Sequence, residues 1–160
     1  MPRPRRVELR WTATQERVLL WLDRLGERLR PHRTPAHLLT GIRGERAALF
    51  ELRRRGYIVV ASRWTTTRSR GDVDLIAWDG PFLCFVEVKS RTARDLTPAN
   101  SAVNDTKRRM LRTLARHYLQ TFRAEQRRTI PVRFDVVSVY QLVDGYEFDL
   151  FAGAFPLSEP

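Results

Sequence analysis

The stretch from Gly71 to Arg91, GDVDLIAWDGPFLCFVEVKSR, constrains the fold of this chain more than any other part of it. It holds two apolar runs on either side of an Asp-Gly pair, which strongly favours a hairpin turn between two strands. Asp74 interrupts the first run, and Glu87 and Lys89 interrupt the second. Because side chains on a strand alternate between the two faces of a sheet, Glu87 and Lys89 point to the same side. The stretch therefore predicts two adjacent strands that carry a cluster of charged side chains.

These charged side chains are costly at half-buried positions unless they have a partner. A carboxylate in such a strand costs several kcal/mol unless it is paired or binds a metal ion. Asp74 and Glu87 on neighbouring strands supply the hard oxygen ligands that a divalent cation prefers, and Lys89 beside them suits a phosphate. The alternative is an ion pair with Lys89 and no metal, which rarely stabilises a protein more than apolar replacements do. We therefore expect Asp74 and Glu87 to be metal ligands, and Lys89 to hold the attacking water in phosphodiester hydrolysis.

The charge balance favours a polyanionic partner. The chain has 29 Lys+Arg against 18 Asp+Glu, a formal net charge of +11, and nucleic acid is the commonest partner of such proteins. Solubility alone is the simpler alternative, and an arginine excess is also typical of a GC-rich genome. Lys89 and Lys107 are the only lysines, so each of them needs its own explanation.

Cysteine content and hydropathy argue against disulfide-rich, secreted and membrane proteins. Cys84 is the single cysteine and lies in an apolar run, so we expect it to be a small core residue. No apolar window is long enough for a transmembrane helix, and the basic N-terminus lacks the apolar stretch of a signal peptide. We therefore expect a cytoplasmic protein with no membrane partner.

The hydrophobic pattern predicts one domain, residues 36–160, preceded by a basic extension, residues 1–35. Within the extension, residues 12–30 have the periodicity of an amphipathic helix, which either packs against the domain, as we favour, or forms a loose or partner-binding arm. The domain pattern alternates between helical and strand periods, with a polar turn expected at residues 65–71. The expected helices and strands are, in order, a helix at 36–55, strands at 57–64, 72–78 and 82–91, a helix from Ser101 or Asn104 to Phe122, a strand at 132–141 and a short segment at 146–151.

The order αβββαβ predicts a mixed sheet with a helix on each face. The third and fourth strands should be parallel, because a long helix crosses over between them.

Five segments together resemble the YraN-like family of small bacterial proteins. They are GERAALFELRRRGY, GDVDLIAWDG, FVEVKSR, NDTKRRMLRTLARHYL and VRFDVVSVY, in the order typical of that family, and the resemblance extends over residues 41–155. The D…ExK arrangement within them resembles the PD-(D/E)XK nuclease superfamily. The resemblance implies a restriction-endonuclease-like core, a mixed β-sheet flanked by helices, to which this chain adds an N-terminal helix.

The resemblance also assigns further roles around the expected metal site. It implies that Glu45 reaches the site from the first core helix, where the alternative is an exposed helix acid. Asp72 stands where the family usually has Glu, and is expected to be an auxiliary ligand. The carbonyl of Val88 completes the coordination in the superfamily pattern, and the expected cation is Mg²⁺, with Mn²⁺ as a substitute.

Basic side chains near these segments are candidates for contacts with nucleic acid. A solvated basic surface is the alternative for each of them, and we prefer that alternative for Arg112. Trp64 is expected in the core rather than as a base-stacking platform. The candidate contacts are Arg63, Arg68, Arg70, Arg91, Lys107 and Arg108.

Taken with the resemblance, the sequence predicts a metal-dependent nuclease that hydrolyses phosphodiester bonds in DNA, and it leaves open whether branched or repair intermediates are the substrates. One alternative is a nucleic-acid-binding protein of nuclease fold with little or no catalysis. Another is an adaptor that binds a partner through the N-terminal helix. Resolvases of this fold act as dimers, so the resemblance leaves a homodimer open.

Overall fold

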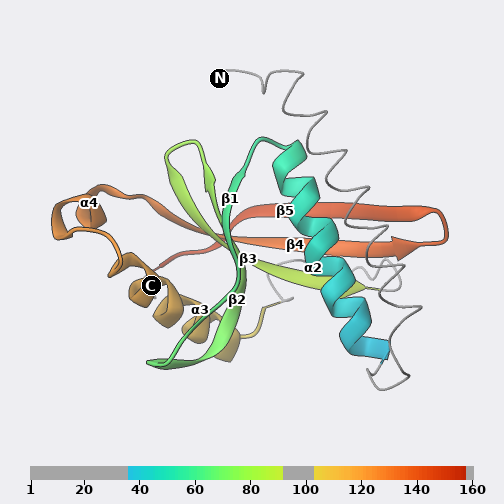
Figure 1. Ribbon diagram of the computed structural model, residues 1–160, viewed down its shortest axis with the longest axis horizontal. Helices are drawn as coiled ribbons and strands as arrows, with labels where there is room; N and C mark the ends of the chain where they lie inside the picture. The colour runs from blue at the N-terminus through green and yellow to red at the C-terminus, as the bar shows by residue number, and fades with distance from the viewer. Residues whose placement is uncertain (1–35, 92–102, 158–160) are drawn as a thin grey trace.

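The computed structural model describes residues 36–91 and 103–157, with side chains from Thr40 onward. The expected extension of residues 1–35 and its helix lie outside the described residues. One five-stranded sheet, in the order β1-β2-β3-β4-β5, forms the centre of the domain (Figure 1). The elements are α2 (Ala36–Arg54), β1 (Ile58–Thr66), β2 (Ser69–Asp79), β3 (Phe82–Arg91), α3 (Asp105–Leu119), α4 (Ala124–Thr129), β4 (Val132–Leu142) and β5 (Gly145–Phe155).

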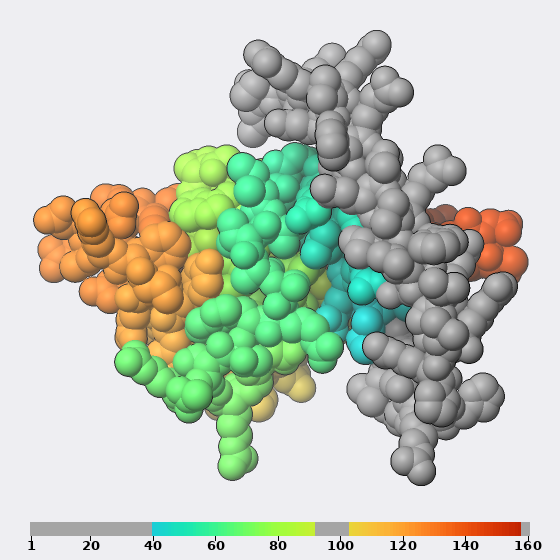
Figure 2. Space-filling view, viewed as in Figure 1, coloured from blue at the N-terminus to red at the C-terminus, as the bar shows by residue number. Residues whose placement is uncertain are grey.

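The sheet is mixed, as the sequence predicts. β3 and β4 are parallel, and the other neighbouring strands are antiparallel. The connection between β3 and β4 contains α3 and the short helix α4, which lies at one end of the elongated molecule, whereas the β4–β5 hairpin extends from the other (Figure 1 and Figure 2). In the strand order given above, β3 occupies the central position of the sheet.

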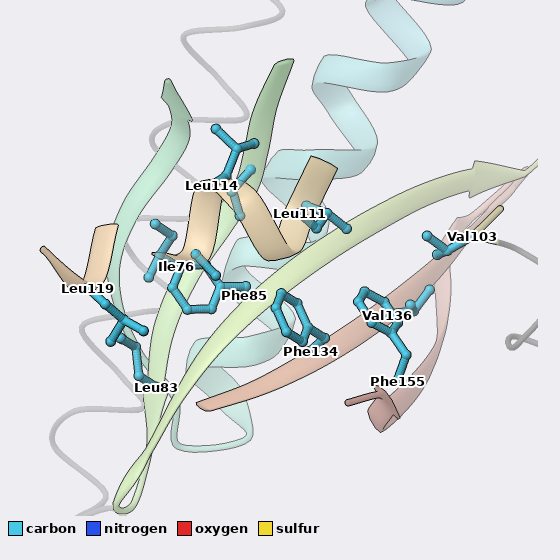
Figure 3. Packing of buried hydrophobic residues seen from close by; sticks show 12 residues of the cluster. Ile76, Leu83, Phe85, Val103, Leu111, Leu114, Leu119, Phe134, Val136 and Phe155 are labelled. Carbon is cyan, nitrogen blue, oxygen red and sulfur yellow. The ribbon is translucent and has the colours of Figure 1, made fainter. Parts of the chain in front are cut away.

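A helix covers each face of the sheet, and each helix buries its own apolar cluster. On one face, Leu114 of α3 packs over the rings of Phe85 and Phe134, and all three side chains are fully buried (Figure 3). On the other face, α2 packs Ala48 and Leu52 over the β2–β3–β4 centre. Burial of each large side chain contributes about 1.5–3 kcal/mol, so these two clusters are the main stabilisation of the domain.

Local signals explain where several elements begin and turn. The side chain of Asn104 accepts the backbone N–H of Lys107 at 2.9 Å, so Asn104 is the N-cap of α3. Gly80, with φ of +55°, provides the left-handed residue in the turn between β2 and β3. The Asp-Gly hairpin predicted from the sequence is thus confirmed.

The polar stretch before β2 is not the long turn that we expected. β1 continues to Thr66, which pairs with Ser69, so that the turn shrinks to two residues. β5 is longer than predicted and ends at Phe155, and the six-residue helix α4 was not predicted. None of the described helices has the length and apolar character needed to cross a membrane.

The positions of Cys84 and Trp64 agree with the sequence-based expectations, whereas that of Arg112 does not. Cys84 is fully buried, as expected for a core residue. Trp64 is partly buried and packs against the core, where its ring makes an edge-to-face contact with Tyr118 at 5.2 Å between centroids. The expectation for Arg112 is wrong: its side chain is buried, donates to the Pro156 carbonyl at 2.9 Å and lies over a Phe ring of β5.

Candidate functional site

The candidate site lies where the pairing of β2 and β3 ends. The paired positions of the two strands run from Asp79 and Phe82 at the turn to Leu75 and Val86. One residue further along β2, Asp74 Oδ2 accepts the backbone N–H of Val88 at 2.6 Å. A carboxylate therefore takes the place of a backbone acceptor at the end of this ladder.

Glu87 is the most enclosed charged side chain of the site. Its side chain is 4% exposed, and Oε1 lies 2.9 Å from the Lys89 ammonium on the same strand. Oε2 lies 2.9 Å from the ammonium of Lys107, which comes from the first turn of α3. Both lysines of the chain therefore contact this single carboxylate. Glu87 and Lys89 share a face, as strand alternation requires.

Asp74 and Glu87 lie near enough to repel each other. Burial raises the pKa of Asp74 to about 7, the charge on Glu87 raises it as well, and the Val88 N–H and Lys107 act in the opposite direction. Such a pKa means that Asp74 holds a proton more strongly than an exposed carboxyl at neutral pH. A buried pair of mutually repelling carboxylates is typical of functional sites.

Glu45 of α2 and Asp72 of β2 add two more carboxylates to this group. Burial raises the pKa of Glu45; Asp72 and Glu87 raise it further, while Arg63 and Lys107 lower it. The Arg63 Nε atom lies 3.6 Å from Glu45 Oε2. The structure therefore brings Glu45 toward the site, half-buried rather than exposed, with an arginine from β1 as its partner.

Arg63 has an unusual backbone for a strand residue. Its φ of +49° is in the left-handed region, which only a few per cent of non-glycine residues adopt. Ala61 and Trp64, three residues apart, both face the α3 side, so the alternation of β1 slips at this point. The local distortion directs Arg63 toward α2 and Glu45, and residues in such conformations often lie at functional sites.

Gly44 holds α2 close to the end of β3. A Cβ atom at this position would collide with Ser90 Oγ and press on Ser90 Cβ, so a side chain here would force Ser90 or the helix to shift. Ser90 Oγ in turn donates to the Thr40 carbonyl at 3.4 Å. This contact places the helix that carries Glu45 beside the strand that carries Glu87 and Lys89.

Lys107 connects α3 to the same group of carboxylates by electrostatic attraction. Burial lowers the pKa of Lys107, but the charges of Glu87, Asp74 and Asp72 raise it by more, so the pKa lies above its usual range. The sequence indicates Lys107 as a nucleic-acid contact, and its ion pair with Glu87 was missed. The scarcity of lysine in the chain was the signal that could have revealed it.

The other candidate nucleic-acid contacts are not gathered at one place. Arg68, in the β1–β2 turn, donates to Gln120 at the C-terminal end of α3 at 2.7 Å. Arg108 lies over the Phe155 ring, and Arg91 ends β3 beside Tyr140 of β4. Arg70 is exposed at the start of β2. Arg63 and Lys107 of the predicted set contact carboxylates of the site.

A second polar centre lies at the other end of β2 and β3, on the face that α2 covers. Arg133 donates to Asp79 at 2.7 Å and to fully buried Asp135 at 2.8 Å, and it also donates to the Tyr57 hydroxyl at 2.8 Å. Asp135 accepts the Gly153 N–H at 2.9 Å. The centre ties β4 to β2 and β5.

The donors at the site are suited to a hard cation, though in an incomplete set. Among residues 36–91 and 103–157, no three His, Cys, Asp or Glu side chains are grouped as a metal centre would require. Asp74 and Glu87, with the Val88 carbonyl, are the oxygen donors that could hold one ion of the Mg²⁺ or Mn²⁺ type. A cation there would relieve the repulsion that raises the pKa of Asp74.

Comparison with known proteins gives this chain a family. Residues 44–139 match the model of the uncharacterised protein family UPF0102. The chain belongs to UPF0102. This confirms the YraN-like resemblance, and every site residue described above, from Glu45 to Lys107, lies within the matched segment.

Similar UPF0102 proteins occur in several bacteria. A protein from Koribacter versatilis is 46% identical over 124 residues, which cover 78% of this chain and 84% of the relative. One from Solibacter usitatus is 43% identical over 118 residues, 74% of this chain and 86% of the relative. A third, from Porphyromonas gingivalis, is 37% identical over 119 residues, 73% of this chain and 84% of the relative. Their names state the family and no activity.

Proposed function

We propose that this UPF0102 protein is a metal-dependent nuclease of the PD-(D/E)XK type that hydrolyses phosphodiester bonds in DNA. The observation that carries the proposal is the burial of Asp74 beside Glu87, whose charge helps to raise the pKa of Asp74. The ammonium of Lys89 forms an ion pair with the same Glu87. Mutually repelling carboxylates destabilise a fold. Their presence on the central strands is therefore better explained by chemistry than by stability.

The architecture is compatible with this proposal. A helix precedes three antiparallel strands, and a second helix leads to a strand parallel to the third. The order of Asp74, Glu87 and Lys89 on the second and third strands is the one that the superfamily motif requires. These features support a restriction-endonuclease-like core for the domain.

The side chains of the site have distinct roles in the proposed reaction. A Mg²⁺ ion held by Asp74 and Glu87 would neutralise phosphate charge and lower the pKa of a bound water. Lys89, whose side chain is 34% exposed, has its ammonium fixed by Glu87 and would orient the attacking water and the scissile phosphate. Glu45, held by Arg63, would position a further water. Hydrolysis then adds water to phosphorus, breaks one P–O bond and leaves a phosphate and a hydroxyl end.

Cleavage assays on defined DNA test this proposal. Single-stranded, duplex, flap and four-way DNA are incubated with Mg²⁺ or Mn²⁺, with matched RNA beside each. We expect metal-dependent cleavage of at least one DNA substrate, and Lys89→Ala and Glu87→Gln each to reduce its rate 100-fold or more, as loss of a charge-stabilising group typically does. Arg116→Met removes a charge from an exposed position of α3 and should leave the rate unchanged.

Two outcomes would contradict the proposal. Cleavage that persists in both site variants would come from another enzyme in the preparation. The absence of cleavage on every DNA substrate, with DNA still bound, would favour the second candidate, a nucleic-acid-binding protein of the same fold without catalysis. One observation favours that candidate: both oxygens of Glu87 are engaged by ammonium groups.

A further inference from the structure

We propose that Lys107 is an internal cation that holds Glu87 in the metal-free protein and that a divalent metal ion displaces it. This inference rests on the proposed function, since it concerns the same carboxylate. It assigns Lys107 a positioning role that differs from a surface contact to nucleic acid. It also predicts that metal binding and phosphate binding by α3 are coupled.

The geometry around Glu87 carries the proposal. Glu87 is 4% exposed and has an ammonium at 2.9 Å from each oxygen, Lys89 at Oε1 and Lys107 at Oε2. One ammonium is sufficient to balance one carboxylate, and Lys89 already does so from the same strand. The second ammonium therefore supplies the additional positive charge that the surrounding acids, Asp74 and Asp72, require when no metal ion is present.

The position of Lys107 in its helix is also defined. The Asn104 side chain caps α3 by accepting the Lys107 backbone N–H at 2.9 Å, so the base of the side chain is fixed relative to β3. The Lys107 side chain is 25% exposed, which leaves its flexible stem a path away from Glu87 toward solvent. The ammonium can thus move while the helix stays in place.

The choice of lysine at this position supports release rather than permanent pairing. The chain uses arginine for nearly all of its basic residues, and both of its lysines lie on Glu87. An arginine fork forms two parallel bonds with a carboxylate, whereas a lysine ammonium is a compact point charge on a flexible stem. Lysine is therefore the better residue where a small cation must later take the same oxygen.

Competition for Glu87 Oε2 has a direct consequence for the bound substrate. When a metal ion holds Glu87, the Lys107 ammonium loses its partner and remains on the first turn of α3. That end of a helix favours anions, because its backbone N–H groups and dipole point outward. Metal binding thus frees a cation for the phosphate, and a bound phosphate in turn favours the metal-bound state.

Calorimetric titration with Mn²⁺ tests the competition. The proteins compared are the wild type, Lys107→Met, which keeps the length of the stem, Lys107→Arg, which keeps the charge, and Arg116→Met as the control for a lost charge on α3. We expect Lys107→Met to bind Mn²⁺ about tenfold more tightly than the wild type, and to melt at a lower temperature without metal and gain more from Mn²⁺. Arg116→Met should bind Mn²⁺ like the wild type, whereas Lys107→Arg, which keeps a cation on Glu87, should bind Mn²⁺ no more tightly than the wild type.

A second measurement follows both lysines directly in the wild-type protein. In protein labelled with ¹³C-lysine, the two lysines give two ε-methylene signals, which Lys89→Arg and Lys107→Arg assign. Saturating Mg²⁺ should move the Lys107 signal toward the position of solvated lysine. A Lys107 signal that stays in place while Mg²⁺ binds would overturn the proposal even if Lys107→Met fails to fold.

The outcomes separate this inference from the proposed function. If the wild type binds Mn²⁺ and Lys107→Met binds it no more tightly, Lys107 does not compete with the metal, and the inference fails while the nuclease proposal stands. If no variant with an intact Asp74 and Glu87 binds Mn²⁺, the metal-dependent function itself fails. Tighter binding by Lys107→Met than by Lys107→Arg supports the competition.

Discussion

At the level of single residues, two opposing effects act on the pKa of Asp74. Asp74 accepts the Val88 N–H, which favours the charged carboxylate, and it lies buried beside Glu87, which favours the protonated one. The second effect is larger, because the pKa rises from 3.8 to about 7. The folded protein therefore binds a proton at Asp74 across a pH range in which the unfolded chain has already lost it.

This difference predicts how stability changes with pH. The stabilisation from protonated Asp74 is complete below pH 3.8 and is lost as the pH rises through about 7, with an upper limit of roughly 4 kcal/mol. Asp74→Asn keeps an oxygen acceptor for Val88 and removes the titration, so the variant should lose less stability than the wild type between pH 4.5 and 7.5. Urea unfolding of metal-free protein across this range measures the difference.

Glu51 supplies a control with the opposite sign. Burial raises its pKa, but hydrogen bonds from Arg55 and Arg54 outweigh burial, and the pKa is lowered. Glu51→Gln should therefore cost stability at neutral pH and little in acid. A wild type and an Asp74→Asn variant with parallel pH profiles would contradict the account of Asp74.

At the level of elements, α3 joins the site to the end of the chain. Its first turn carries Lys107 to Glu87, and Arg112 reaches the Pro156 carbonyl after β5 and lies 5.7 Å from the centre of the Phe155 ring. Two charged side chains of one helix are thus used for internal contacts in a protein rich in exposed arginines.

Replacement of Arg112 should therefore reduce stability without changing the chemistry of the site. Arg112→Met keeps the apolar stem but removes the hydrogen bond to Pro156 and the cation over Phe155, which together contribute about 1–3 kcal/mol. Arg116→Met, on an exposed position of the same helix, should change stability by less than about 0.5 kcal/mol. Urea unfolding measures both variants. Equal midpoints would contradict the internal role of Arg112 and would favour the solvated position expected from the sequence.

These elements also show what the sequence can predict. The apolar runs, the Asp-Gly turn and the strand alternation that places Glu87 beside Lys89 are local properties, so pattern alone predicts them. Arg112 and the Lys107–Glu87 pair depend on segments that are distant in sequence, and no periodicity reports such contacts. The stretch around Thr66 and Ser69 reads as a turn because its residues are polar, but backbone pairing with a neighbour keeps it in the sheet.

At the level of the whole molecule, an acidic site lies in a strongly basic protein. The formal net charge is +11, whereas Glu45, Asp72, Asp74 and Glu87 gather at one end of β3. In the proposed function, the positive charge would attract the phosphates of a nucleic acid over a Debye length, and the local acids would then select for a cation between protein and phosphate.

Affinity for duplex DNA should accordingly depend on salt. Each phosphate contact releases counterions, so a protein that makes several contacts loses at least tenfold in affinity between 50 and 200 mM salt. Lys89→Ala removes only one cation and should change the slope of log K against log salt by about one. Fluorescence anisotropy over the salt series measures both, and a flat response would remove nucleic acid as the partner.

The parallel pairing of β3 with β4 has a further consequence during synthesis. β1, β2 and β3 emerge from the ribosome as a meander long before Val132–Leu142 of β4 exists, so the β4-facing edge of β3 waits without a partner. An unpaired edge with apolar residues such as Val86 and Val88 is a template for aggregation. Glu87 and Lys89 interrupt that edge with charge, as gatekeeper residues do. We therefore expect the same two side chains to limit aggregation of the nascent chain until the strand that completes the sheet has been made.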